Sequence, residues 1–225
     1  GTVWVADKNA KGSGLELMAE LPRLTGCRTL ACNNIRPETR PFYHFLGYET
    51  GRLGHFYRLA DKSAYNLTQI VERDIPPVDG DASLIPLETA EVLRQSGFVP
   101  SQEANPCKDL WYLARRYYAY PRQSYDVYGV MLPGEKAPAA LLCTRTIHAS
   151  GTAVLRIADV VGPPAVLSRA GAAIDSLMQT VGAEYADLYC TGIDAALLRQ
   201  AGFAEREEDS PNIIPNYLNP PLHAN

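Results

Sequence analysis

The sequence predicts a mixed α/β fold that is divided into two units. Short apolar runs typical of strands alternate with segments whose apolar residues recur every three or four positions, as in helices. Residues 61–84 are polar and contain Pro76–Pro77 and Asp79–Gly80–Asp81, which indicates a linker. The length of 225 residues suffices for two small domains, and a composition of 46% hydrophobic and 20% charged residues excludes a disordered chain.

The first unit covers residues 1–60. Pro22 is expected to kink or end its first helix early, and Gly26 and Gly47 are placed to end its two helices. Because the chain opens directly in a strand, we expect residues before Gly1 and a unit that is incomplete at its N-terminus. The expected elements are a strand at 2–6, a helix at 15–24, a strand at 28–32, a helix at 41–46 and a hairpin of strands at 48–50 and 53–59.

The second unit covers residues 85–210, and residues 211–225 are expected to form an irregular tail. Its order of elements is typical of a mixed α/β layer fold. Both 93–98 and 198–203 end a helix with Gly-Phe, which reflects either ordinary capping chemistry or a duplicated domain. The expected elements are helices at 87–96 and 107–119, strands at 125–132, 138–147 and 152–160, a helix at 166–181, a strand at 185–190 and a helix at 194–201.

Charge and cysteine content limit the class of function. Twenty-one basic and 25 acidic side chains give a net charge of -4, which argues against binding to nucleic acid. No apolar run approaches the roughly 20 residues of a membrane-spanning helix, so no membrane partner is expected. The five cysteines form no C-x-x-C pair and no metal-ligand spacing with the four histidines. We therefore expect reduced, mostly buried thiols, no metal and a cytoplasmic protein.

The segment that bears on chemistry is the turn between the first strand and the first helix. It reads Asn9-x-x-Gly12-x-Gly14. Glycines in such a turn let consecutive backbone N–H groups point inward, and the positive end of the following helix dipole lies behind them. Lys8 and Lys11 add positive side chains. The turn is therefore suited to hold a pyrophosphate, although a glycine pair before a helix is also common in plain loops.

A downstream segment, Pro41-Phe42-Tyr43-x-x-Leu46-Gly47-Tyr48, extends this pattern. With the strand, the glycine turn and the helix, it resembles the carboxyl-terminal half of the GNAT acetyltransferase superfamily, over residues 3–59. The resemblance implies an acyltransferase that uses acetyl-coenzyme A. Asn9 replaces the Gln or Arg that is usual in the family's turn. By this resemblance the cofactor-binding residues are Val5, Asn9, Ala10, Lys11, Gly12, Ser13, Gly14 and Asn34.

The resemblance also gives roles within the reaction. An amine would attack the thioester directly while the backbone N–H near Val5 polarises its carbonyl. Tyr43 would be the catalytic residue that protonates the leaving thiolate, or else an aromatic side chain packed on the sheet. Asn33 or Asn34 would hold the pantetheine arm, or else stabilise its own turn.

The second unit is similar to a degenerate second copy of the same fold, which would give tandem domains. The turn after its third strand reads Gly162-Pro163-Pro164, and proline has no N–H to offer a phosphate. Leu198 stands in the place of the tyrosine. This unit is therefore expected to shape the acceptor site. Arg156 and Asp159 are the candidate substrate-binding pair, since charges on an inner strand need partners.

The sequence thus predicts an enzyme that moves an acetyl or other acyl group from acetyl-coenzyme A to a small amine, with an amino-sugar nucleotide as the first candidate. The expected partners are this small molecule and, in one arrangement, a second copy of the chain in a homodimer. The alternative is a catalytically inactive ligand-binding or scaffolding protein with the same fold. Asn9 and the proline-blocked second turn would fit that alternative.

Overall fold

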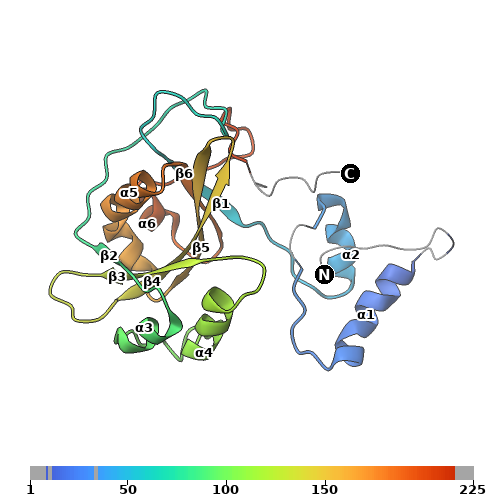
Figure 1. Cartoon of the computed structure of the whole chain (residues 1–225). Coiled ribbons are helices and arrows are strands. Elements are labelled where there is room, and N and C mark those ends of the chain that lie inside the picture. The colour runs from blue at the N-terminus through green and yellow to red at the C-terminus, as the bar shows by residue number, and fades with distance from the viewer. Residues whose placement is uncertain (1–8, 10–11, 33–34, 216–225) are drawn as a thin grey trace. The chain divides into compact units, whose positions relative to one another are not determined.

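The structure of the protein is a computed structural model that describes residues 9, 12–32 and 35–215. The chain divides into two compact units, Gly1–Arg52 and Leu53–Asn225. Both units are drawn in Figure 1.

The first unit contains three helical segments in its described part. They are α1 (Ser13–Thr25), the 3₁₀ turn η1 (Pro37–Thr39) and α2 (Arg40–Phe45). Gly26 and Gly47 end the two α-helices in the left-handed conformation, with φ of 65° and 81°, as expected. Pro22 lies inside α1, so the expectation of an early end is wrong.

The strands expected in the first unit have different outcomes. The strand at 2–6 lies outside the described residues. Residues 28–32 form no strand, because no other strand in the described part of this unit pairs with them. Residues 48–50 are irregular as well, so the expected hairpin is wrong.

The second unit is built on one seven-stranded sheet in the order β2-β3-β4-β5-β6-β1-β7. All neighbouring strands are antiparallel except β5 and β6, which are parallel. The expected mixed α/β fold class is therefore confirmed. The strands are β1 (Gly54–Leu59), β2 (Ser83–Pro86), β3 (Asp126–Met131), β4 (Ala140–Ala149), β5 (Thr152–Val161), β6 (Ala183–Cys190) and β7 (Ala204–Glu205).

The helices of this unit cover the two faces of the sheet (Figure 1). One face packs against η3, α5 and α6 through apolar residues that include Leu155, Ile174 and Phe203. The other packs against α3 and α4 through Leu93 and Leu113. The helical segments are α3 (Ala90–Gln95), α4 (Leu110–Leu113), the π-helical η2 (Ala114–Tyr118), the 3₁₀ η3 (Pro164–Arg169), α5 (Gly171–Thr180) and α6 (Ala195–Gln200).

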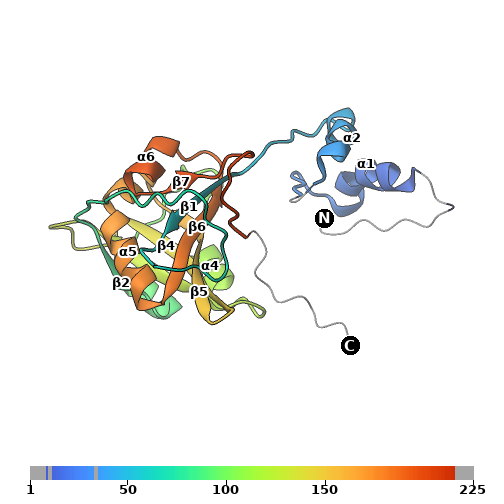
Figure 2. The same cartoon turned by 90° about the horizontal axis from the view of Figure 1, so that it is seen from above.

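Strand β1 is the main departure from the expected topology. It lies between β6 and β7, antiparallel to both, and so belongs to the sheet of the second unit (Figure 2). Its register sets His55 opposite Tyr189 and Tyr57 opposite Asp187. Five of its six residues are buried. A hairpin with residues 48–50 would have left most of this strand exposed, whereas its position between β6 and β7, with packing on both faces of the sheet, buries it.

Residues 60–82 contain no helix or strand, as a linker would, yet they belong to the second unit and pack on its sheet. Tyr65, Leu67 and Ile70 contact the apolar cluster around Tyr185. Gln69 forms an isolated antiparallel bridge with Ile213 near the end of the described chain. This segment and the residues around 211–215 therefore cover the part of the sheet that α3 and α4 leave open.

The cysteines differ in their exposure to solvent. All five cysteines are free, but only Cys143 is buried and Cys107 is exposed, so the expectation of mostly buried thiols is wrong.

Among the described residues, no helix has both the length and the apolar character needed to cross a membrane.

Arg58 connects β1 to helix α5, on the face of the sheet that η3, α5 and α6 cover. Its side chain is 3% exposed and donates through Nε and Nη2 to both carboxylate oxygens of Asp175 on α5. Its Nη1 donates to the carbonyls of Pro76 and Gly202, each at 3.1 Å. A buried guanidinium needs such partners, so β1 is fixed by polar contacts as well as by its ladder.

We expect Gly202→Ala to destabilise the protein more than Gly134→Ala. Both glycines have a left-handed backbone, with φ of 83° and 80°, so each substitution costs about 1–2 kcal/mol. A Cβ at Gly134 meets no atom within 4 Å, whereas one at Gly202 would overlap the Arg58 guanidinium. The disturbed hydrogen bonds add roughly 1.5–3 kcal/mol, measurable by urea denaturation. Equal losses in the two variants would contradict the role of Arg58.

Candidate functional site

A cavity of about 790 Å³ lies in the second unit, at the carboxyl ends of the parallel strands β5 and β6. The two strands pair from Ala153 to Ile157 and then separate. Beyond that point β5 remains paired with β4 as far as Val161, and β6 remains paired with β1 as far as Cys190. The strands diverge because each follows a different neighbour, and the cavity fills the space between them. Ligands commonly bind at the carboxyl ends of parallel strands.

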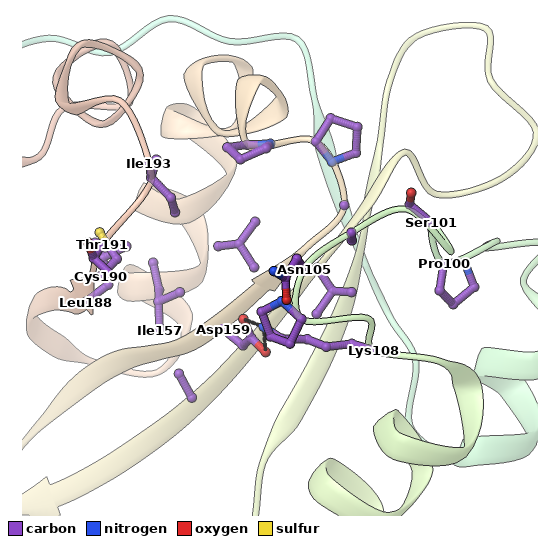
Figure 3. Close-up of a pocket in the computed structure, with 18 of the residues that line it drawn as sticks. Pro100, Ser101, Asn105, Lys108, Ile157, Asp159, Leu188, Cys190, Thr191 and Ile193 are labelled. Carbon is purple, nitrogen blue, oxygen red and sulfur yellow. Dashed lines mark hydrogen bonds and ion pairs between the residues drawn. The ribbon is translucent and has the colours of Figure 1, made fainter. Parts of the chain in front are cut away.

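The wall of the cavity is apolar on most sides and polar at a few points. Figure 3 shows Ile157 and Asp159 of β5 between two groups of residues, those at the end of β6 and just after it on one side and those of the α3–α4 connection on the other. The polar lining residues are Ser101, Asn105, Lys108, Asp159, Tyr189 and Thr191. This is the usual composition of a small-molecule site, and the volume falls in the usual range of about 300–1,000 Å³.

A β-bulge sets the direction of Asp159. Asp159 is opposite Cys143 on β4 while Ile157 is opposite Thr144, so Ala158 is an extra residue on β5. The extra residue reverses the alternation of side chains along the strand. Asp159 therefore shares a face of the sheet with Arg156, three residues earlier.

Asp159 is held by two hydrogen-bond donors at the cavity. Lys108 Nζ donates to both of its carboxylate oxygens, at 2.6 and 2.7 Å, as Figure 3 shows. The Tyr117 hydroxyl donates to Oδ2 at 2.6 Å. Burial, the nearby Cys143 and this hydrogen bond raise the pKa of Tyr117 well above its ordinary value. Tyr117 therefore stays protonated and serves as a fixed donor.

A second polar cluster surrounds Asp187, in the middle of β6. This carboxylate is fully buried, and it accepts from Arg156 Nε at 2.9 Å and Nη2 at 2.8 Å. His55 Nε2 lies 3.1 Å from its Oδ2. Burial opposes the charge of Arg156, but the hydrogen bonds to Asp187 raise the guanidinium pKa. The Tyr189 hydroxyl lies 3.0 Å from His55 Nδ1, and its ring stacks on the imidazole with centroids 4.0 Å apart.

The predicted pair of Arg156 and Asp159 is not a pair in the structure. Arg156 bonds to Asp187, and Asp159 bonds to Lys108 and Tyr117. The bulge puts both side chains on one face, yet each finds a nearer partner from another element. Asp159 lines the cavity, and Arg156 is not among its lining residues.

The predicted cofactor turn is only partly within the described residues. Val5, Ala10, Lys11 and Asn34 lie outside them. Asn9 is an exposed turn residue. Gly12 precedes α1 with φ of 91°, a conformation that favours glycine, and its carbonyl accepts from the amides of Leu15 and Glu16. Ser13 and Gly14 are the first two residues of α1, so the described part of the turn does open a helix.

Tyr43 lies on α2, in the same unit as the turn. Its hydroxyl donates to Cys32 Sγ at 3.8 Å, and its ring meets Tyr48 edge to face. Burial and the neighbouring Cys32 raise the pKa of Tyr43. The phenol is therefore protonated at neutral pH, as a proton donor must be.

The turn after β5 lacks the donors of a phosphate site. Gly162 has φ of 125°, and Pro163 and Pro164 lead directly into η3. A Cβ at Gly162 would come within 3.0 Å of Ala139 and Ala140. Gly162 is therefore needed for close packing of the backbone. With two prolines after it, the turn offers no set of backbone N–H groups for a phosphate.

Sequence reasoning did not identify His55, Asp187, Tyr189, Lys108 and Tyr117 as site residues. His55 lies on β1, and the sequence contained no sign that β1 joins β6. The sequence does hold one signal for Asp187: it is a charged residue within the run of residues 183–188, all of which are buried in β6. In the described part of the chain, no group of three His, Cys, Asp or Glu side chains could hold a metal ion.

The chain is similar to several solved structures. One is a protein of unknown function from Enterococcus faecalis V583, a probable N-acyltransferase, with 15% identity over 90% of this chain and 50% of that one and a TM-score of 0.48. A GCN5-related N-acetyltransferase from Anabaena variabilis ATCC 29413 has 13% identity over 88% and 49%, with a TM-score of 0.49. A GCN5-related N-acetyltransferase from Kribbella flavida has 15% identity over 69% and 55%, with a TM-score of 0.37.

The chain spans about half the length of these solved proteins. No protein-family model matches it, and no curated protein matches its sequence. The fold class is set by the chain's own strand order.

We expect Asp187→Ala to destabilise the protein strongly. The substitution leaves the partly buried Arg156 guanidinium without its carboxylate, and breaking a buried ion pair costs about 3–5 kcal/mol, an upper bound for a pair whose arginine is partly exposed. Asp81→Ala is the control, because Asp81 pairs with Arg169 at the exposed surface and its loss should change stability little. Thermal unfolding of both variants measures the difference. A similar small effect in both would show that Asp187 is not needed to neutralise Arg156.

Proposed function

We propose that the protein transfers an acyl group from coenzyme A to a small amine. The observation that carries this proposal is the cavity of the second unit. It opens at the carboxyl ends of two parallel strands, it has the volume of a small-molecule site, and Lys108, Asp159 and Tyr189 give it a few polar groups in an apolar wall. In this proposal the cavity takes the acceptor.

The charge pattern of the cavity fits an amine that carries further polar groups. Asp159 can accept a hydrogen bond from an ammonium or amine. Lys108 Nζ has three donors and uses two of its contacts on Asp159, so it can also meet a hydroxyl, carboxylate or phosphate oxygen of the same molecule. An amino-sugar nucleotide combines these groups and remains the first candidate.

The donor is proposed to bind at the turn before α1. Gly12 has the left-handed backbone that such a turn requires, and the 13-residue helix behind it supplies a positive end for the pyrophosphate. The resemblance of the motifs at Asn9-x-x-Gly12-x-Gly14 and Tyr43-x-x-Leu46-Gly47 to those of the GNAT superfamily supports the same assignment. Tyr43, with its raised pKa, is the proposed proton donor to the thiolate.

The alternative of a ligand-binding protein without turnover is favoured by one observation. The turn at Gly162-Pro163-Pro164 gives the second unit no phosphate site, so this unit does not bind coenzyme A in the manner proposed for the first. Binding of acetyl-coenzyme A without release of thiol in the presence of amines would support this alternative.

We expect Gly12→Glu to abolish the binding of acetyl-coenzyme A, because the carboxylate would repel the pyrophosphate. Gly26→Glu is a matched control: it adds the same charge at a left-handed glycine, with φ of 65°, at the other end of α1. Calorimetric titration of the full chain measures both. Equal affinity in the two variants, or no binding by the unsubstituted protein, would overturn the proposed donor site.

We expect Ser101→Trp to raise KM for the acceptor at least about tenfold and to leave acetyl-coenzyme A binding unchanged. Ser101 lies on the cavity wall in an exposed loop, so the indole can fill the cavity without disturbing the core. Ser124→Trp is the control, since Ser124 is also exposed but lies outside the cavity. Steady-state kinetics with amino-sugar nucleotides measures KM. An unchanged KM in Ser101→Trp would place the acceptor elsewhere.

A further inference from the structure

We propose that the Lys108 side chain occupies a binding site for a primary ammonium group on Asp159, and that an amine which enters the cavity binds by displacing Lys108 from this carboxylate. The inference rests on the proposed function for the choice of an amine, and it lies wholly within the second unit. It makes Lys108 an internal competitor of the ligand, a role that the proposed function does not include.

The contacts of the Asp159 carboxylate are those that any primary ammonium group would make. Lys108 Nζ lies 2.6 and 2.7 Å from the two carboxylate oxygens, so a single ammonium bridges both of them (Figure 3). The ammonium of a ligand has the same charge and the same three N–H donors as Nζ. It can therefore form with Asp159 the hydrogen bonds that Lys108 forms.

Tyr117 is the fixed partner of Asp159. Its side chain is 5% exposed, and its ring is held edge to face by Tyr112 and Tyr125, with centroids 6.5 and 5.3 Å away. Its hydroxyl donates to Oδ2 of Asp159 at 2.6 Å. Because this hydrogen bond does not involve Lys108, the carboxylate keeps a donor and its direction when the lysine leaves.

Lys108 is the exchangeable partner. Its side chain is 23% exposed and carries its ammonium on a flexible four-carbon stem. Residues 101–107 before it are all exposed, and among the described residues their hydrogen bonds, such as those of the Cys107 thiol, stay within the segment. Asp109 after it caps α4 through the amide of Tyr112. The Lys108 ammonium can therefore move away while the cap of α4 stays intact.

The ion pair of Asp187 shows what a permanent pair looks like in the same sheet. Asp187 has no exposed side-chain surface, and Arg156 of the neighbouring strand β5 binds it through both Nε and Nη2. Asp159 is 15% exposed and lines the cavity, and its cation comes from the connection between two helices. A partly exposed ion pair contributes little to stability, so a second ammonium can replace the first at little cost.

The cavity has room for the rest of an amine. Its lining includes the apolar side chains of Ile157 and Val160 from β5 and of Leu188 from β6. The carbon chain of an amine can pack against them while its ammonium takes the place of Nζ. The displaced ammonium of Lys108 is then free to meet oxygen atoms of a larger ligand.

Calorimetric titration of the full chain with n-butylammonium, without coenzyme A, tests the competition. We expect Lys108→Met to bind this amine at least about tenfold more tightly than the unsubstituted protein does, because a competitor that fills a site about 90% of the time weakens its apparent affinity about tenfold. Lys136→Met is the matched control: Lys136 is exposed and lies outside the cavity lining, so the affinity should not change.

Two further measurements separate this site from a simple attraction of charge. Butyltrimethylammonium has the charge but no N–H donor, so it should gain less affinity in Lys108→Met than n-butylammonium gains. Asp159→Asn, which keeps the shape of the side chain and removes its charge, should abolish the binding of n-butylammonium in the Lys108→Met background. An equal gain for the two cations, or binding that survives Asp159→Asn, would overturn the inference.

The inference and the proposed function can fail separately. Binding of n-butylammonium by Lys108→Met that is no tighter than in the unsubstituted protein, or no binding by the unsubstituted protein, would overturn the inference alone. No binding of acetyl-coenzyme A would overturn the proposed donor site and leave the titrations with n-butylammonium unaffected.

A spectroscopic test follows Lys108 in the unsubstituted protein. In the chain labelled with ¹⁵N-lysine, the Nζ signal of Lys108 is identified by its loss in Lys108→Arg, which keeps a cation beside Asp159. We expect this signal to move towards that of the exposed Lys136 as n-butylammonium saturates the site, because the ammonium leaves its ion pair for water. A Lys108 signal that stays unchanged at saturation would overturn the inference.

Discussion

The buried carboxylate of Asp187 is the constraint on which the second unit depends. It lies at 0% exposure in the middle of β6, and it receives a guanidinium from β5 and an imidazole from β1. A charge at this depth is tolerated only with such partners. The requirement links three strands whose positions in the sequence are far apart, and it specifies that the strand beside β6 is β1. The positions of β5 and β1 on either side of β6 therefore depend on the same side chain.

The sequence allowed most elements of the second unit to be predicted, because their apolar periodicity is local. The strands at 125–132 and 152–160 appear within one or two residues of β3 and β5. The glycines after α3 and α6 end their helices in the left-handed conformation, as Gly97 and Gly202 were expected to do. What failed was pairing: β1 was assigned to a hairpin, and the short β2 and β7 were not foreseen. Which strands pair depends on contacts across the whole unit.

The site was less predictable than the fold for a physical reason. Arg156 and Asp159 were recognised as charges that need partners, but the partners, Asp187 and Lys108, lie 31 and 51 residues away along the chain. The direction of Asp159 depends on the extra residue Ala158, and a bulge leaves no mark in the hydrophobic pattern of β5. The turn at residues 9–14 is a local motif and could be read directly, although its role remains a proposal.

The place of β1 in the sheet has a consequence for how the chain is made. His55 meets Asp187 only after another 132 residues have been added, and β7 follows later still. At about 5–20 residues per second of synthesis, β1 waits roughly ten seconds for its neighbours. During this interval Phe56, Tyr57 and Leu59 have no sheet to enter. A pairing of such high contact order folds slowly, and the nascent strand is a natural target for chaperones.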